Sequence, residues 1–113
     1  MTRVALVTGA ASNIGLSVAR DLARDHRVIL ADVADCDALA SELGNGAVFL
    51  RGDVSSPEDC RRWIEQAGLM GGLNVLVHSA GITRPTVPAG QISLSDWHDV
   101  LRVNLTGSFV LLQ

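Results

Sequence analysis

A glycine-rich segment lies near the start of the chain, directly after a short apolar run at residues 4–7. Residues 8–15 are Thr-Gly-Ala-Ala-Ser-Asn-Ile-Gly. A strand that ends in such a turn and continues into a helix directs unpaired backbone N–H groups and the positive helix end at an anion such as a pyrophosphate. We therefore expect bound phosphates beside Gly9, Ser12, Asn13, Ile14 and Gly15.

A carboxylate closes the second apolar run, residues 28–31. Asp32 follows the glycine turn by about 20 residues, the separation at which an acid at a strand tip accepts hydrogen bonds from adenosine ribose hydroxyls. Its charge repels a 2′-phosphate, and neither Ser12 nor Val33 supplies a basic side chain to hold one. These features predict a dinucleotide site for NAD, with NADP less favoured. The alternative for Asp32 is a solvated loop carboxylate, because acids are common at strand ends.

The composition is that of a globular protein with one hydrophobic core. The chain has 113 residues, of which 48% are hydrophobic and 19% charged, with a net charge of -3. We expect a single domain over residues 1–113 without a membrane span, because the apolar runs are too short. A cytoplasmic location is expected because the N-terminus lacks the apolar length of a secretory signal. The scattered arginines form no basic stripe, which argues against a nucleic-acid partner.

The cysteines and histidines indicate no metal centre. Cys36 and Cys60 lie far apart without C-x-x-C spacing, which favours two small buried residues over ligands or a redox pair. The three histidines are dispersed along the chain and lack the spacing of metal ligands.

Apolar runs alternate with segments of helical period. Strands are predicted at residues 4–7, 28–31, 47–50 and 73–77. Continuous Val, Ile and Leu runs are typical of parallel strands covered on both faces, and right-handed crossovers give the strand order 3-2-1-4. The sequence therefore predicts an α/β fold with a Rossmann-like doubly wound parallel sheet.

Helix starts and buried helix faces follow from residue types and spacing. Ser56 followed by Pro57 predicts a capped helix, and Ser93 has capping-box spacing to Asp96. The buried faces are expected at Ile14, Val18 and Leu22 in the first helix, at Cys60, Trp63, Ile64 and Ala67 in the third, and at Trp97, Leu101, Leu105 and Leu112 in the last.

Taken in order, these motifs resemble the N-terminal half of a short-chain dehydrogenase/reductase, over all 113 residues. The resemblance rests on residues 8–15, where the family has T-G-x3-G-x-G, and on Gly-Asp-Val at 52–54. It also rests on His-Ser-Ala-Gly at 78–81, where the family has N-N-A-G, and on Val-Asn-Leu-Thr-Gly at 103–107. It implies that Asp53 bonds the adenine amino group, that Val54 packs the ring, and that Ala80 and Gly81 let the backbone approach the ribose.

Two positions depart from the family pattern. Asn13 replaces the middle glycine, and asparagine is the non-glycine residue that best tolerates a left-handed backbone, although its side chain narrows the space near the phosphates. His78 and Ser79 replace two asparagines that, by resemblance, brace the fourth strand against the cofactor turn. The sequence leaves open whether this bracing is kept.

Asn104 and Asp53 each have two interpretations. Asn104 shares a helix face with Trp97, Leu101 and Leu105, where an amide requires hydrogen bonds. By resemblance it holds a water in the proton relay behind a catalytic lysine, and the alternative is a core asparagine with satisfied hydrogen bonds that bends the helix.

Asp53 has a second interpretation besides the adenine contact, as the phosphoryl acceptor of a receiver domain. That fold needs acids after the first strand and a later lysine, and the chain has neither.

The resemblance implies an NAD-dependent oxidoreductase that moves a hydride between nicotinamide and a carbonyl or alcohol carbon. In the family a tyrosine transfers the proton, a lysine lowers its pKa and a serine orients the substrate. The chain contains no tyrosine and no lysine. We therefore expect residues 1–113 to be the cofactor-binding segment, incomplete at its C-terminus and inactive alone.

The expected partners are a small-molecule substrate and further copies of the protein. A secondary alcohol, a sugar or a 3-oxoacyl thioester would be compatible, and the family implies a homo-oligomer, either a dimer or a tetramer. The alternative function is a non-catalytic NAD-binding sensor or regulatory module.

Overall fold

The computed structural model of the chain describes residues 3–11, 13–82 and 87–112. Strands and helices alternate along the first two thirds of it. The elements are β1 (Arg3–Thr8), α1 (Asn13–Leu22), β2 (His26–Asp32), α2 (Asp37–Leu43), β3 (Val48–Arg51), α3 (Pro57–Leu69) and β4 (Val75–His78). A short 3-10 turn, η1 (Ala89–Gln91), then precedes one continuous helical stretch made of α4 (Leu94–Val100), the π-helical η2 (Leu101–Thr106) and α5 (Gly107–Leu112).

The four strands form one parallel sheet in the order β3-β2-β1-β4. This confirms the predicted order 3-2-1-4. In the register, Val7 of β1 lies between Leu30 of β2 and Val77 of β4. Because all strands run the same way, their carboxyl ends meet at one edge of the sheet, which is where ligands bind in open α/β folds.

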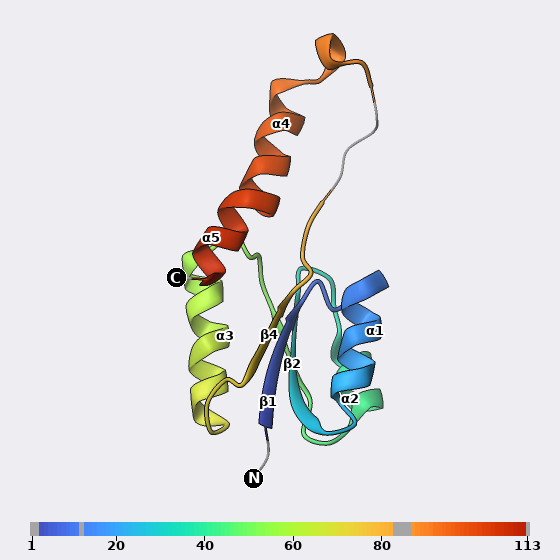
Figure 1. Cartoon of the computed structure of the whole chain (residues 1–113), viewed down its shortest axis with the longest axis vertical. Coiled ribbons are helices and arrows are strands. Elements are labelled where there is room, and N and C mark those ends of the chain that lie inside the picture. Colours follow the sequence, from blue (N-terminus) through green and yellow to red (C-terminus); the bar gives the residue numbers. More distant parts are fainter. Residues whose placement is uncertain (1–2, 12, 83–86, 113) are drawn as a thin grey trace.

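Helices cover both faces of the sheet, with α1 and α2 on one side and α3 and α5 on the other (Figure 1), and alternate strand residues build a core on each face. On one face, Val7 and Leu30 pack with α1 and α2. On the other, Leu6 and Ile29 pack with Trp63 of α3 and with α5. The period of two along a strand explains this division.

Each cysteine belongs to one core. Cys36 and Cys60 are buried, free thiols, as predicted. Burial raises the pKa of both thiols, so both stay protonated near neutral pH and act as small apolar residues.

The predicted caps of two helices are confirmed. The Ser56 hydroxyl accepts a hydrogen bond from the Asp59 amide at 3.2 Å, with Pro57 at the first helical position. The Ser93 hydroxyl accepts one from the Asp96 amide at 3.0 Å. Each serine satisfies a backbone donor that has no acceptor within its helix.

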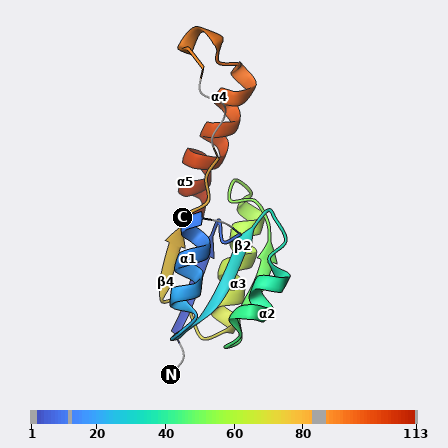
Figure 2. The same cartoon turned by 90° about the vertical axis from the view of Figure 1, so that its right-hand side faces the viewer.

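The helical stretch from α4 to α5 extends beyond the carboxyl edge of the sheet (Figures 1 and 2). The predicted burial of its apolar face is wrong for this chain, since Trp97 is 54% exposed, Leu105 65% and Leu112 69%. Gly107 and Leu111, at the end of the stretch, are its buried residues. The helical periodicity of a sequence identifies an apolar face, but it does not show whether another element packs against that face.

Two further residues are less buried than the helical period predicted. Ile14 is 72% exposed and Ile64 is 42% exposed. Gly15 and Ala19 are the buried residues of α1, because small side chains let this helix lie close to the sheet.

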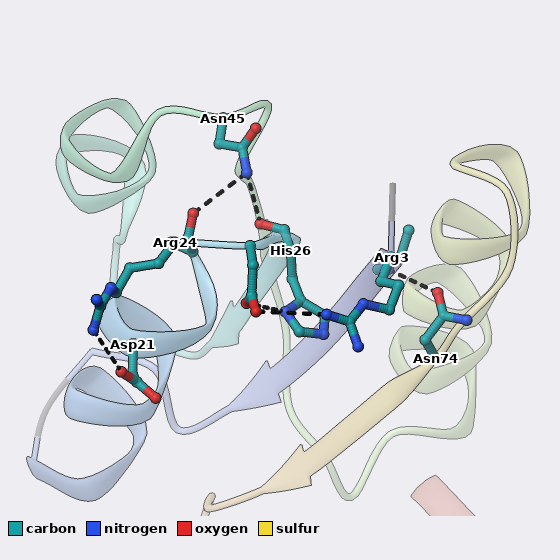
Figure 3. A network of polar contacts seen from close by, with 9 residues as sticks. Arg3, Asp21, Arg24, His26, Asn45 and Asn74 are labelled. Carbon is teal, nitrogen blue, oxygen red and sulfur yellow. Dashed lines mark hydrogen bonds and ion pairs between the residues drawn. The ribbon is translucent and has the colours of Figure 1, made fainter. Parts of the chain in front are cut away.

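Polar contacts close the opposite, amino end of the sheet (Figure 3). The Asn45 amide donates to the His26 carbonyl at 3.1 Å, and Asn74 accepts from the Val4 amide at 2.8 Å. The His26 ring lies 2.6 Å from an Asp25 carboxylate oxygen, and this hydrogen bond lowers the pKa of Asp25. These contacts join loops to the starts of the strands.

No helix within the described ranges is both long and apolar enough to cross a membrane.

Candidate functional site

A cavity of about 510 Å³ opens at the carboxyl ends of the strands. Its lining includes most of the residues that the sequence singled out. These are Gly9, Asn13, Ile14, Asp32, Asp53, Val54, Ala80 and Gly81. Gly15 and Asn104 do not line it, and Ser12 lies outside the described residues.

The glycine turn has the backbone geometry that the sequence predicted. Gly9 has a φ of 65° and Asn13 a φ of 55°, so asparagine does adopt the left-handed conformation at the family's glycine position. A Cβ on Gly9 would lie 2.8 Å from the Ala80 nitrogen, and one on Gly15 would lie 2.1 Å from the Gly9 carbonyl oxygen. Gly15 therefore lets the first turn of α1 pack directly against the backbone of Gly9.

Asp32 is held at the cavity rim by two backbone amides. One carboxylate oxygen accepts from the Ala11 amide at 2.9 Å and the other from the Ala34 amide, also at 2.9 Å. Each oxygen of an ionised carboxylate can accept more than one hydrogen bond. The side chain is thus oriented and still able to accept from a ligand.

Arg51 is a functional candidate that the sequence reasoning missed. Its Nε donates to the Val33 carbonyl at 2.7 Å, directly after Asp32. The strand register pairs Asp32 with Arg51. A search for basic residues across the strand pair, rather than only along the chain, would have found it.

Arg102 joins the π-helical stretch to the loop after β3. Its Nη1 donates to an Asp53 carboxylate oxygen at 3.0 Å and to the Ser55 hydroxyl at 2.7 Å. Burial disfavours the Asp53 carboxylate, but the hydrogen bonds from Ser55 and Arg102 outweigh it and hold the pKa of Asp53 below its ordinary value. Asp53 is therefore a fixed anion on the cavity wall.

The bracing between β4 and the glycine turn is present, and Thr8 is at its centre. The buried Thr8 hydroxyl accepts from the Ser79 amide at 3.0 Å and from the Ala80 amide at 3.1 Å. The His78 Nδ1 lies 2.8 Å from the same oxygen. Although histidine and serine replace the two asparagines, the end of β4 is tied to the residue that precedes Gly9.

Asn104 holds the chain that leaves β4. Its Oδ1 accepts from the Ile82 amide at 2.7 Å, and its Nδ2 donates to the Ile82 carbonyl at 2.8 Å. Asn104 is exposed rather than part of a buried face, but the oxygen and the nitrogen of its amide each make a hydrogen bond, as expected. Ile82 lines the cavity, so Asn104 shapes the cavity through Ile82.

A family model described as short chain dehydrogenase matches residues 3–113. The chain belongs to this family. The match also rules out the receiver-domain alternative for Asp53, because receiver domains are a different family.

Two curated relatives of this short-chain dehydrogenase chain are themselves named dehydrogenases. The chain is 40% identical over 111 residues to a cis-4-hydroxycyclohexanecarboxylate dehydrogenase of Sinomonas cyclohexanicum, covering 93% of this chain and 45% of the relative. It is 37% identical over 118 residues to a D-threitol dehydrogenase of Mycolicibacterium smegmatis, covering 98% of this chain and again 45% of the relative. The chain thus spans a little under half the length of these relatives.

Proposed function

We propose that the protein carrying this chain binds NAD at the carboxyl edge of the sheet and transfers a hydride to or from a small hydroxylated or carbonyl compound. The observation that supports this best is the position of Asp32. Its carboxylate accepts from Ala11 in the glycine turn and lines the same cavity as Gly9. One cavity therefore offers amide donors for phosphates beside an acceptor for ribose hydroxyls.

The phosphate end of the site fits a dinucleotide on two observations. The first amides of α1 have no acceptor within the helix, and Asn13, Ile14 and Gly9 line the cavity next to them. Gly9 has no Cβ, so the turn lies directly against Ala80 and a ligand can approach its backbone closely.

At the adenosine end we assign two acids to different atoms. Asp32 accepts from the ribose hydroxyls and repels a 2′-phosphate, which favours NAD over NADP. Asp53, oriented by Arg102 and Ser55, accepts from the adenine amino group, and Val54 packs against the ring.

At the nicotinamide end, Ala80, Gly81 and Ile82 form the wall, and Asn104 fixes Ile82. When bound, NAD supplies the C4 atom that accepts or donates the hydride. The chain holds no tyrosine and no lysine. We therefore assign proton transfer to a part of the protein outside residues 1–113, with Asn104 contributing to the proton relay behind it.

The substrate class follows from the reaction and from the relatives. Both relatives are dehydrogenases of hydroxylated small molecules by name. We propose a secondary alcohol or the corresponding ketone as substrate. We also propose a homo-oligomer, supported by the exposed apolar side chains along α4 and α5.

The test is NAD binding by the full-length protein, measured by calorimetry for the wild type, Asp32→Ala and the control Asp21→Ala. Asp21, near the end of α1, forms an exposed ion pair with Arg24 in the following turn and does not line the cavity. We expect NAD to bind more tightly than NADP, and Asp32→Ala to weaken NAD binding about tenfold or more, which is about 1.4 kcal/mol. Equal NAD affinity in all three proteins would contradict the proposal.

Activity is tested separately by NADH formation with a panel of secondary alcohols. Turnover by the full-length protein, with none by residues 1–113 alone, supports an oxidoreductase. NAD binding without turnover of any alcohol or ketone favours the sensor or regulatory module instead.

A further inference from the structure

A chain of hydrogen bonds connects the glycine turn to Asn104 through two side chains. His78 Nδ1 lies 2.8 Å from the Thr8 hydroxyl, and His78 Nε2 lies 2.8 Å from the Ser108 hydroxyl. Ser108 donates in turn to the Asn104 main-chain carbonyl at 2.8 Å. The half-buried imidazole thus bridges β1 and α5, elements that are far apart in the sequence.

The direction of each bond follows from counting donors and acceptors. A hydroxyl has one proton and two acceptor positions. Thr8 already accepts from the Ser79 and Ala80 amides, so its own proton is left for His78 Nδ1. A neutral imidazole that accepts at Nδ1 carries its proton on Nε2, and this proton is donated to Ser108.

A protonated imidazole does not fit this chain. Both ring nitrogens would then carry protons, and the Nδ1 proton would face a Thr8 oxygen whose acceptor positions are in use. One of the bonds from Ser79 or Ala80 would have to break, or the ring would have to move away from Thr8. Either change disturbs the link between β4 and the glycine turn.

We propose that His78 is a pH-dependent positioning residue. With its proton on Nε2 it fixes the Asn104 segment relative to the glycine turn, and protonation of the ring releases that segment. The consequence for cofactor binding rests on the proposed function, whereas the tautomer and its coupling to Ser108 do not.

The surroundings of the ring determine the pH range. Thr8 of β1 and Ser108 of α5 contact the two ring nitrogens, and neither side chain is charged. Burial, with no contribution from a neighbouring charge, lowers the pKa of His78. The unfolded chain therefore binds the proton first as the pH falls below about 6.5. The stability that depends on neutral His78 is complete above that pH and is lost as the pH falls through the folded-state pKa.

The first experiment is nitrogen-15 NMR of the histidine rings in the full-length protein, with His78→Asn used for assignment. We expect the Nε2-protonated tautomer for His78 near neutral pH, and conversion to the imidazolium below the ordinary histidine pKa. An Nδ1-protonated ring, or a ring already charged near neutral pH, would overturn the proposal. This measurement requires no cofactor, so it stands even if NAD does not bind.

The second experiment measures NAD affinity against pH for the wild type and three variants. His78→Asn keeps a polar group near Thr8 but cannot titrate, Ser108→Ala removes the link to Asn104, and His98→Asn changes an exposed histidine of α4 as a control. For the wild type and His98→Asn, we expect the Kd to rise below the His78 pKa by up to about tenfold per pH unit, the limit for one proton. His78→Asn should give a flat profile and Ser108→Ala a shallower one.

The variant profiles separate positioning from a merely structural role. If His78 had only a structural role, replacing it by asparagine would lower the affinity for NAD at every pH. The slope of the Kd against pH would then stay as in the wild type. A wild-type slope in both His78→Asn and Ser108→Ala would overturn the proposal. Absence of NAD binding at any pH in the wild type would instead contradict the proposed function.

Discussion

Arg51 and Val33 are joined by a hydrogen bond of 2.7 Å from the guanidinium Nε to the main-chain carbonyl. This bond places a cation on the strand next to Asp32, the acid proposed to bind the ribose. Asp32 and Arg51 should have opposite effects on the 2′-phosphate of NADP, because a carboxylate repels it and a guanidinium attracts it. In the proposed binding mode Asp32 faces the ribose directly, so we expect its repulsion to outweigh the attraction of Arg51 and to favour NAD.

Removal of the acid should therefore reveal Arg51 as a phosphate ligand. In the full-length protein, we expect Asp32→Ser to raise the affinity for NADP relative to NAD about tenfold. Adding Arg51→Met to that variant should remove most of the gain in NADP affinity, whereas adding Arg24→Met, at a surface ion pair just after α1, should not. Calorimetric titration with both cofactors measures this. The same NADP affinity with and without Arg51 would show that Arg51 has no role in cofactor choice.

The packing between Gly15 and the turn gives a prediction for stability. A Cβ at Gly15 would lie 2.1 Å from the Gly9 carbonyl oxygen, and backbone must move to make room for it. We expect Gly15→Ala to lower the free energy of unfolding by about 1–3 kcal/mol, as overpacking does, and to weaken NAD binding as well.

Gly68 provides the matched control, because it lies in α3 and a Cβ there would meet no atom within 4 Å. Gly68→Ala should raise the free energy of unfolding by about 0.4–1 kcal/mol, through a smaller loss of chain entropy on folding. Denaturant unfolding of both variants measures the difference. A Gly15→Ala variant as stable as Gly68→Ala would show that the turn is not tightly packed.

Local sequence rules predicted the elements and their order, but long-range side-chain contacts were beyond them. Ser56 and Ser93 were identifiable as caps because each acts on an amide three residues later. By contrast, the contact from Arg102 to Asp53 spans 49 residues and that from His78 to Ser108 spans 30. Such pairs depend on how elements approach one another in space, which periodicity does not specify.

The misassigned apolar residues have the same cause. The period of α4 and α5 indicated an apolar stripe, but Trp97 and Leu105 are exposed because the helix extends past the sheet. Ile14 was expected in a buried face, and it lines the cavity instead. A hydrophobic residue beside a cavity has the same sequence signature as one in a core.

The Arg102 bridge predicts a change in the pH dependence of stability. We expect Arg102→Met to be less stable near neutral pH by about 0.2–1 kcal/mol, the range for exposed ion pairs. The pKa of Asp53 is held below its ordinary value in the folded protein. This contribution is therefore present above about pH 4, the ordinary aspartate range, and is lost as the pH falls through the folded-state pKa.

The difference in stability between wild type and Arg102→Met should accordingly shrink on acidification. Urea unfolding at a series of pH values measures this difference, with Arg20→Met, at the exposed ion pair between α1 and Glu42 of α2, as the control. A stability difference that stays constant down to acid pH would mean that Arg102 acts by packing and not through the Asp53 charge.

The exposed stripe on the last helix predicts self-association of residues 1–113 when they are produced alone. Leu105, Phe109 and Leu112 lie about one turn apart and are 64–69% exposed. Large exposed apolar surfaces associate in water because contact removes them from solvent. We expect concentration-dependent sedimentation of the wild-type chain and a shift towards monomer in Leu105→Glu combined with Phe109→Glu. Leu69→Glu, at the exposed end of α3, should leave the sedimentation unchanged, and a single monomeric boundary for the wild-type chain at all concentrations would refute the prediction.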